Sequence, residues 1–216
     1  MTPTIFGFLV AVIGTALMWR SVTAMLCLVI ICTLLGAASA IDVPALGGSS
    51  IQPAHMALGF LLIRLAFSPY ARLDRVATAL RTNLWFVLYA STTLIYATVP
   101  LRFSPQNITT AVYLIGTCVM VLAVTLVVQS ERRTDLIVRA CIGVAWLHIG
   151  MGLADLALAA VGHADLLNIL RNASYSQLSQ EVAGARRISG SFPETSAYSL
   201  YAFNWLVLMT ELRLRN

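Results

Sequence analysis

Seven apolar runs, separated by short polar segments, follow one another along the chain. A helix needs roughly 20 apolar residues, within a usual range of about 17–25, to cross the hydrocarbon core of a bilayer. Most of the runs reach this length, and the first and last are the shortest. They cover residues 4–19, 22–40, 51–67, 83–99, 109–128, 136–161 and 196–208. The pattern predicts an all-α fold: a polytopic bundle of seven transmembrane helices forming one domain over residues 1–216.

Two loop segments between these runs have the spacing of an amphipathic surface helix. In residues 68–82, the apolar side chains Leu73, Val76 and Leu80 fall on one helical face and the charged side chains fall elsewhere. Residues 165–171 form a shorter segment of the same kind. Both segments are expected to lie on the membrane surface, and neither has a pattern typical of catalysis.

The composition supports a membrane protein. Hydrophobic residues make up 59% of the chain and charged residues only 11%, whereas a soluble domain has about 25% charged residues. A soluble protein this apolar would have too few polar groups to cover its surface. The four cysteines lie inside apolar runs, where a thiol behaves as a small hydrophobic side chain.

The basic residues, all of them arginine, predict an orientation for the bundle. If the N-terminus lies outside, nine arginines fall in or beside the inner loops and four in the outer loops, as the positive-inside rule requires. The inner set is Arg20, Arg72, Arg75, Arg81, Arg132, Arg133, Arg139, Arg213 and Arg215. Because these charges are not gathered on one face, we expect no nucleic-acid partner.

The long polar segment at residues 162–196 is predicted to lie outside. Loops longer than about 12–15 residues are usually functional or disordered. This loop contains adjacent arginines, Arg186 and Arg187, against the positive-inside tendency. The planar guanidinium fork of arginine suits bidentate recognition of phosphate. The loop therefore predicts a site for a diphosphate-bearing substrate, and the alternative is a solvated basic loop.

The last apolar run is expected to begin as a helix just after Pro193. Gly190 allows another group to approach the backbone closely. Ser191 or Ser196 could cap the helix, whose N-terminus would itself favour an anion. These features extend the predicted anion site toward the membrane.

The run at residues 187–199, RISGSFPETSAYS, resembles the signature before a mid-chain helix in the O-antigen ligase and polymerase family. That signature has an arginine, a glycine and a phenylalanine, followed by a short polar segment that enters the membrane. Residues 47–55, GGSSIQPAH, are similar to the turn that opens an early helix in many members. Family members usually have more spans and a large periplasmic loop, so the layout resembles the N-terminal portion of such a protein.

The resemblance implies a multi-pass glycosyltransferase of the bacterial inner membrane, with a periplasmic N-terminus. It would act in O-antigen, lipopolysaccharide or exopolysaccharide synthesis, taking glycan from an undecaprenyl-diphosphate carrier on the periplasmic side. The matching positions imply catalytic roles for Arg187 and Glu194, and substrate binding by Arg186, Arg187 and Gly190. Its partners would be the lipid-linked glycan and membrane lipid. Polymerisation and ligation both stay open, as does the identity of the glycan.

Ionisable residues inside a span are functional candidates by default. His148 and Asp155, seven residues apart in the sixth run, share a helical face. They suggest an alternative function, a small-solute or ion transporter with a proton relay, although polar residues of this kind more often join helices together. Gly116, Gly143, Gly150 and Gly152 are expected to be helix-packing sites. No motif for a metal or a phosphate-cradling loop occurs, so we expect no metal and no cofactor.

Overall fold

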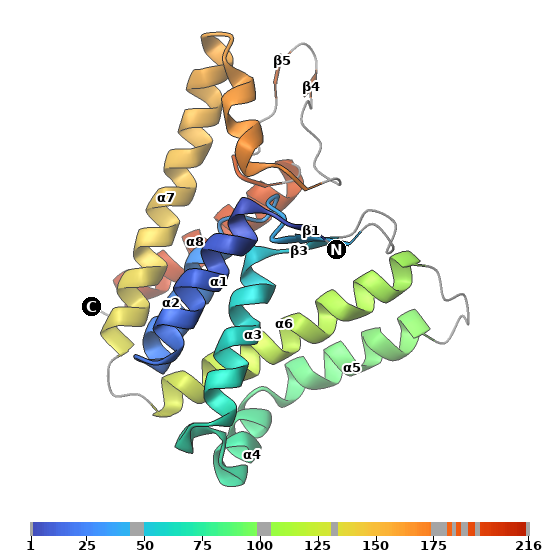
Figure 1. Cartoon of the computed structure of the whole chain (residues 1–216), viewed down its shortest axis with the longest axis vertical. Coiled ribbons are helices and arrows are strands. Elements are labelled where there is room, and N and C mark those ends of the chain that lie inside the picture. The colour runs from blue at the N-terminus through green and yellow to red at the C-terminus, as the bar shows by residue number, and fades with distance from the viewer. Residues whose placement is uncertain are drawn as a thin grey trace.

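Each of the seven predicted apolar runs contains one helix in the computed structural model, and the predicted surface helix in residues 68–82 is also present. The structure describes residues 2–43, 50–98, 105–130, 134–173, 181–182, 185–186, 190–192 and 195–214. Within these ranges the fold is all-α, as predicted, and the strands are only two residues long (Figure 1). The elements are β1 (Thr2–Pro3), α1 (Ile5–Met18), α2 (Val22–Cys32), β2 (Ile41–Asp42), β3 (Ser50–Ile51), α3 (Pro53–Ala66), the 3-10 helix η2 (Pro69–Ala71), α4 (Leu73–Thr82), α5 (Leu84–Thr98), α6 (Pro105–Ser130), α7 (Thr134–Ala160), the 3-10 helix η3 (Ala164–Leu170), β4 (Glu181–Val182), β5 (Ala185–Arg186) and α8 (Thr195–Leu214).

Two of the helices in the described ranges are long and apolar enough to cross a membrane. They are α6, over Ala111–Ser130, and α7, over Thr134–Ala160. Of the most apolar stretch, only 11% is buried inside the protein in α6 and only 28% in α7. The core helix of a soluble protein would be mostly buried, whereas a span leaves its apolar side chains to the lipid. Both helices therefore indicate a location in the membrane.

Local polar groups mark where the first helices begin. The side chain of Thr4 accepts a hydrogen bond from the Gly7 N–H at 3.3 Å, and Ser21 accepts one from the Ala24 N–H at 3.4 Å. Both are N-caps that satisfy an amide left open by the first helical turn. The helix α3 begins at Pro53, whose ring suits the first helical position.

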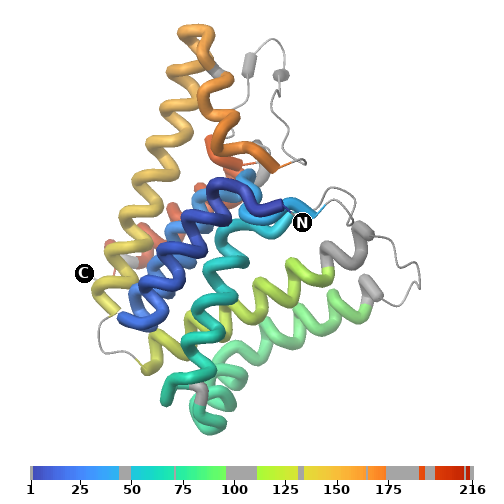
Figure 2. Tube along the Cα trace, viewed as in Figure 1, coloured from blue at the N-terminus to red at the C-terminus, as the bar shows by residue number. Residues whose placement is uncertain are grey.

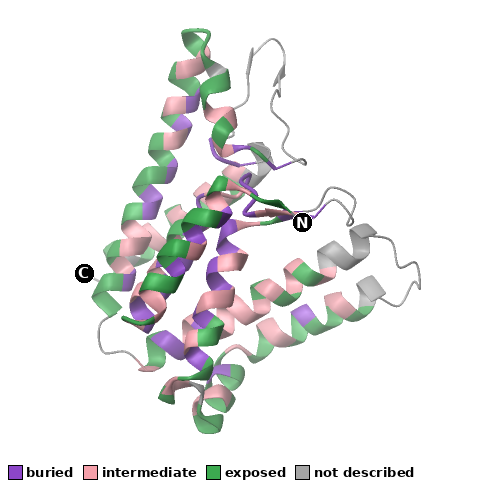
Figure 3. Cartoon of the chain, viewed as in Figure 1, coloured by how far each residue is buried: buried purple, intermediate pink, exposed green. Residues whose placement is uncertain are grey.

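The core of the molecule lies around α2, which packs against α1, α3, α6 and α7. Met25 and Leu26 of α2, Leu61 of α3 and Val127 of α6 are fully buried there. Figure 3 shows this buried region at the centre and the largely exposed outer faces of α1, α5 and α7. The trace in Figure 2 shows α5 and α6 running together, away from α7.

The second apolar run differs from the prediction, because α2 ends at Cys32 and not near residue 40. Residues 33–40 instead form a buried turn, in which Ala37, Ser39 and Ala40 have no exposed surface. The turn leads into a small antiparallel sheet of order β1-β2-β3. Small side chains let the turn enter the bundle, and its backbone groups are bonded by distant segments, which makes burial outside a helix possible.

Candidate functional site

A buried ion pair links α7 to the start of the long loop. Asp155 lies on α7 and Arg171 follows η3, and their side chains are 1% and 0% exposed. Arg171 Nη2 lies 2.9 Å from Asp155 Oδ2. Both charges are removed from solvent, so each requires the other to offset the cost of its burial.

The chain reverses at Gly162 to bring Arg171 back to Asp155. Gly162 has a φ of +77°, the left-handed conformation that favours glycine. The His163 N–H then donates to the Leu158 carbonyl at 2.8 Å, a bond typical of a glycine-terminated helix. The η3 helix runs back along α7 from this turn (Figure 1).

Gly190 joins the ion pair from the other end of the loop. Its N–H donates to Asp155 Oδ2 at 3.1 Å, and its carbonyl accepts from Arg171 Nε at 2.6 Å. The φ of Gly190 is +54°, and a Cβ here would lie 2.9 Å from the Tyr198 ring. A side chain does approach the Gly190 backbone closely, and it is that of Tyr198; the predicted role of Gly190 in substrate binding stays a prediction.

Arg171 keeps unused donor capacity inside this network. Neither Nη1 nor Nη2 makes a hydrogen bond with proper geometry to a described residue, so the Nη2 contact with Asp155 is an ion pair without an aligned N–H. Buried donors without acceptors cost free energy, which the ion pair with Asp155 and the Nε bond to Gly190 have to offset. The pair consequently acts as an anchor whose loss would leave a charge buried.

The N-terminal end of the long loop, at Asn172 and Ala173, is bound to the buried turn at residues 33–40. The Ser39 N–H donates to the Asn172 Oδ1 at 2.7 Å, and the Ala173 N–H donates to the Ala37 carbonyl at 3.0 Å. Asn172 and Ala173, which make these bonds, directly follow Arg171 in the chain. The loop therefore leaves the bundle at this turn.

The C-terminal end of the loop, at Ser191, is bound to the same turn. The Ala37 N–H donates to the Ser191 carbonyl at 2.9 Å, and the Ser191 hydroxyl donates to the Leu34 carbonyl. The prediction that Ser191 or Ser196 caps the last helix is thus wrong for Ser191, because this hydroxyl satisfies a carbonyl beyond the end of α2, and Ser196 lies inside α8. The helix α8 begins at Thr195, close to the predicted start after Pro193.

Beneath Gly190 lies an aromatic cluster centred on His148. The His148 ring is stacked on Tyr198 at 4.3 Å between centroids, tilted to Tyr201 at 4.9 Å and edge-on to Phe192 at 5.4 Å. His148 is 1% exposed, and neither of its ring nitrogens has a hydrogen bond to a described residue. Both members of the predicted His148–Asp155 pair are buried, but Asp155 takes Arg171 as its ion-pair partner.

The predicted site residues are described to different extents. Gly190 belongs to the anchor, and Arg186 is the register partner of Glu181 in the β4–β5 hairpin. Arg187 and Glu194 lie outside the described residues. Arg171 is not among the site residues predicted from the sequence. The signal for it is Asp155 itself, since a carboxylate inside a span needs a cationic partner.

Comparisons with protein-family models, with curated proteins and with solved structures gave no match. Within the described residues, no group of three or more His, Cys, Asp and Glu side chains is placed to hold a metal ion.

Proposed function

We propose that this chain is a multi-pass bacterial inner-membrane protein of seven spans with a periplasmic N-terminus, similar in activity to the O-antigen ligases and polymerases. It would transfer glycan from an undecaprenyl-diphosphate carrier on the periplasmic side. The observation that carries the proposal is the double attachment of the loop containing Arg186 and Arg187. That loop starts and ends at one buried anchor, formed by Asp155, Arg171 and Gly190.

The position of the anchor supports a reaction close to a membrane surface. Asp155 lies five residues before the end of α7 at Ala160, which is about 8 Å along a helix that rises 1.5 Å per residue. The α7 helix is long and apolar enough to cross a membrane. A diphosphate attached to a lipid chain would meet the protein at this level, where the hydrocarbon ends.

Two arginines supply the chemistry that glycan transfer needs. When the bond between the sugar and the diphosphate breaks, negative charge develops on the leaving diphosphate. The guanidinium groups of Arg186 and Arg187 would neutralise this charge by paired hydrogen bonds. Glu194 would take the proton of the attacking hydroxyl, as a general base does. A loop held at both ends loses less conformational entropy on binding than a free one, which favours such a site.

The transporter alternative receives less support from the contacts of Asp155. Its carboxylate already accepts the Gly190 N–H and pairs with Arg171. A proton relay requires a hydrogen-bonded path between its groups, but neither ring nitrogen of His148 makes a hydrogen bond to a described residue. The geometry therefore favours anchoring by Asp155 over relay.

Replacing Arg187 in the full chain tests the proposal. In a strain without the chromosomal gene, Arg187→Ala should lower surface-glycan assembly about a hundredfold, the usual effect of removing a donor from a developing anion. Arg187→Lys should also be impaired, because lysine keeps the charge but not the planar fork. The matched control is Arg139→Gln, at an exposed position on α7.

Glycan length and linkage would be compared on gels at equal amounts of membrane-inserted protein. Wild-type glycan from both Arg187 variants would refute its role in the reaction. An equal loss in Arg139→Gln would point to a general effect of charge on insertion, which also contradicts a specific role for Arg187.

A further inference from the structure

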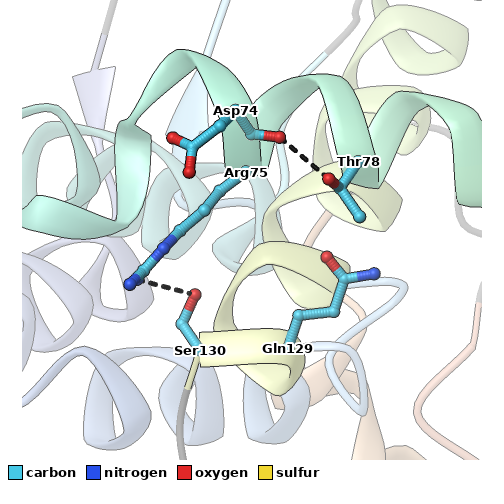
Figure 4. A pocket seen from close by; sticks show the side chains of 5 residues that line it. All are labelled: Asp74, Arg75, Thr78, Gln129 and Ser130. Carbon is cyan, nitrogen blue, oxygen red and sulfur yellow. Dashed lines mark hydrogen bonds between the residues drawn. The ribbon is translucent and has the colours of Figure 1, made fainter.

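A second polar site lies away from the loop, between α4 and the C-terminal end of α6. It is a cavity of about 500 Å³, open on one side. Figure 4 shows the five side chains that line it, with Arg75 reaching across from α4 toward α6. The lining residues are Asp74, Arg75, Thr78, Gln129 and Ser130.

This cavity is placed where a membrane surface would be. The span-length part of α6 ends at Ser130, and the next span-length helix begins at Thr134. The cavity therefore opens where two spans leave the hydrocarbon. Phe67, at the end of α3, and Trp85, in the first turn of α5, precede and follow α4 in the chain, and each is 84% exposed. Large aromatic side chains are enriched at the level of the lipid head groups.

The α4 helix has the character of a surface-bound segment. Its apolar residue Leu73 is 88% exposed, while Ala79 on another face is buried against the bundle. An apolar side chain left open beside arginines is typical of a helix lying at the interface, with its apolar face in the lipid. The cavity is consequently within reach of a phospholipid head group.

Arg75 is held in place by uncharged groups. Its Nη1 donates to the Ser130 hydroxyl at 3.3 Å, and its guanidinium lies 5.9 Å from the centre of the Tyr70 ring. The structure records no ion pair for Arg75 among the described residues. A guanidinium positioned by a hydroxyl group and an aromatic ring is suited to an incoming phosphate.

Asp74 gives the same cavity a negative charge. Its carboxylate lies 3.6 Å from Arg72 Nε, and the two side chains are 70% and 68% exposed. A pair this exposed is weak and easily exchanged. The cavity therefore presents one cation and one anion to the same ligand.

We propose that this cavity binds the head group of phosphatidylethanolamine. Arg75 binds the phosphate and Asp74 binds the ammonium, while Thr78, Gln129 and Ser130 offer further hydrogen bonds. A head group with a phosphate and a primary ammonium matches both charges. Phosphatidylglycerol lacks the cation, and the methylated ammonium of phosphatidylcholine cannot donate hydrogen bonds to Asp74.

The test measures lipids bound to the full chain. The purified protein would be exchanged into detergent with equal amounts of phosphatidylethanolamine, phosphatidylglycerol and phosphatidylcholine, and bound lipid would be counted by native mass spectrometry. The wild-type protein should retain phosphatidylethanolamine in preference to both others. Arg75→Gln should weaken its retention about tenfold, the effect of losing a charge-assisted bond.

Asp74→Asn provides an independent arm, because this exposed side chain can be changed without loss of folding. It should leave phosphatidylethanolamine no better retained than phosphatidylcholine. Arg81→Gln is the matched control, since it removes the same charge from an exposed position of α4 outside the cavity. Preferential retention of phosphatidylglycerol by the wild-type protein would overturn the proposal, and so would an equal loss in Arg81→Gln.

Discussion

Arg171→Met breaks the buried anchor at the base of the long loop. The variant loses the 2.9 Å ion pair with Asp155 and the 2.6 Å hydrogen bond to the Gly190 carbonyl. Both charged side chains are almost completely buried, so the remaining carboxylate would keep its desolvation cost without its cation. Removing one partner of a buried pair typically costs about 3–5 kcal/mol. We expect the free energy of unfolding to fall by about this amount.

A double-variant cycle separates the ion pair from general packing. Unfolding of Arg171→Met, Asp155→Leu and the double variant would be followed by denaturant titration in mixed micelles. The double variant should be more stable than Arg171→Met because no charge is then left buried, but it should stay about 1–3 kcal/mol below the wild type, since the Gly190 N–H and carbonyl lose their partners. Arg72→Met, which breaks the exposed pair with Asp74, is the control and should cost less than about 1 kcal/mol. If Arg171→Met costs as little as this control, the pair is not an anchor.

Two further variants test the packing around the anchor. In a thermal unfolding assay, Gly152→Ala should destabilise the protein by about 1–3 kcal/mol, the usual cost of overpacking, because the new Cβ would lie 1.9 Å from the Tyr198 hydroxyl. Gly150→Ala is the control and should be neutral or stabilising, since no described atom lies within 4 Å of its Cβ position. Ser191→Ala should cost about 1–3 kcal/mol by leaving the buried Leu34 carbonyl without its donor, and a melting temperature equal to that of the wild type would contradict the proposed attachment.

The position of every long helix was predictable because hydropathy is a local property of the chain. The end of α2 was not, since residues 33–35 are Thr-Leu-Leu and contain no helix breaker. The chain leaves the helix there to form bonds such as that between Ala37 and Ser191, which are far apart in sequence. A contact across that distance leaves no pattern in either segment.

In the candidate site, too, the sequence predicts local features but not contacts between distant segments. The sequence identifies Asp155 as an acid inside a span, but helical spacing offers only partners on its own helix, and so it suggested His148. Arg171 returns to Asp155 through the turn at Gly162, which depends on packing of η3 against α7.

The sequence also does not show which of the predicted packing glycines face a neighbouring helix. A Cβ at Gly152 or Gly116 would lie within 3.0 Å of a neighbouring side chain, whereas Gly143 and Gly150 have no described neighbour within 4 Å and the packing expectation fails there.

The shared attachment of both loop ends at residues 33–40 would let the part of the loop before Arg186, residues 174–185, be exchanged as a unit. The free-energy cost of closing a loop grows only with the logarithm of its length, by about 0.6 kcal/mol for each doubling. The bundle and its anchor would therefore accept segments of different length and sequence at nearly the same stability. Selection could change what the loop recognises without altering the helices that hold it.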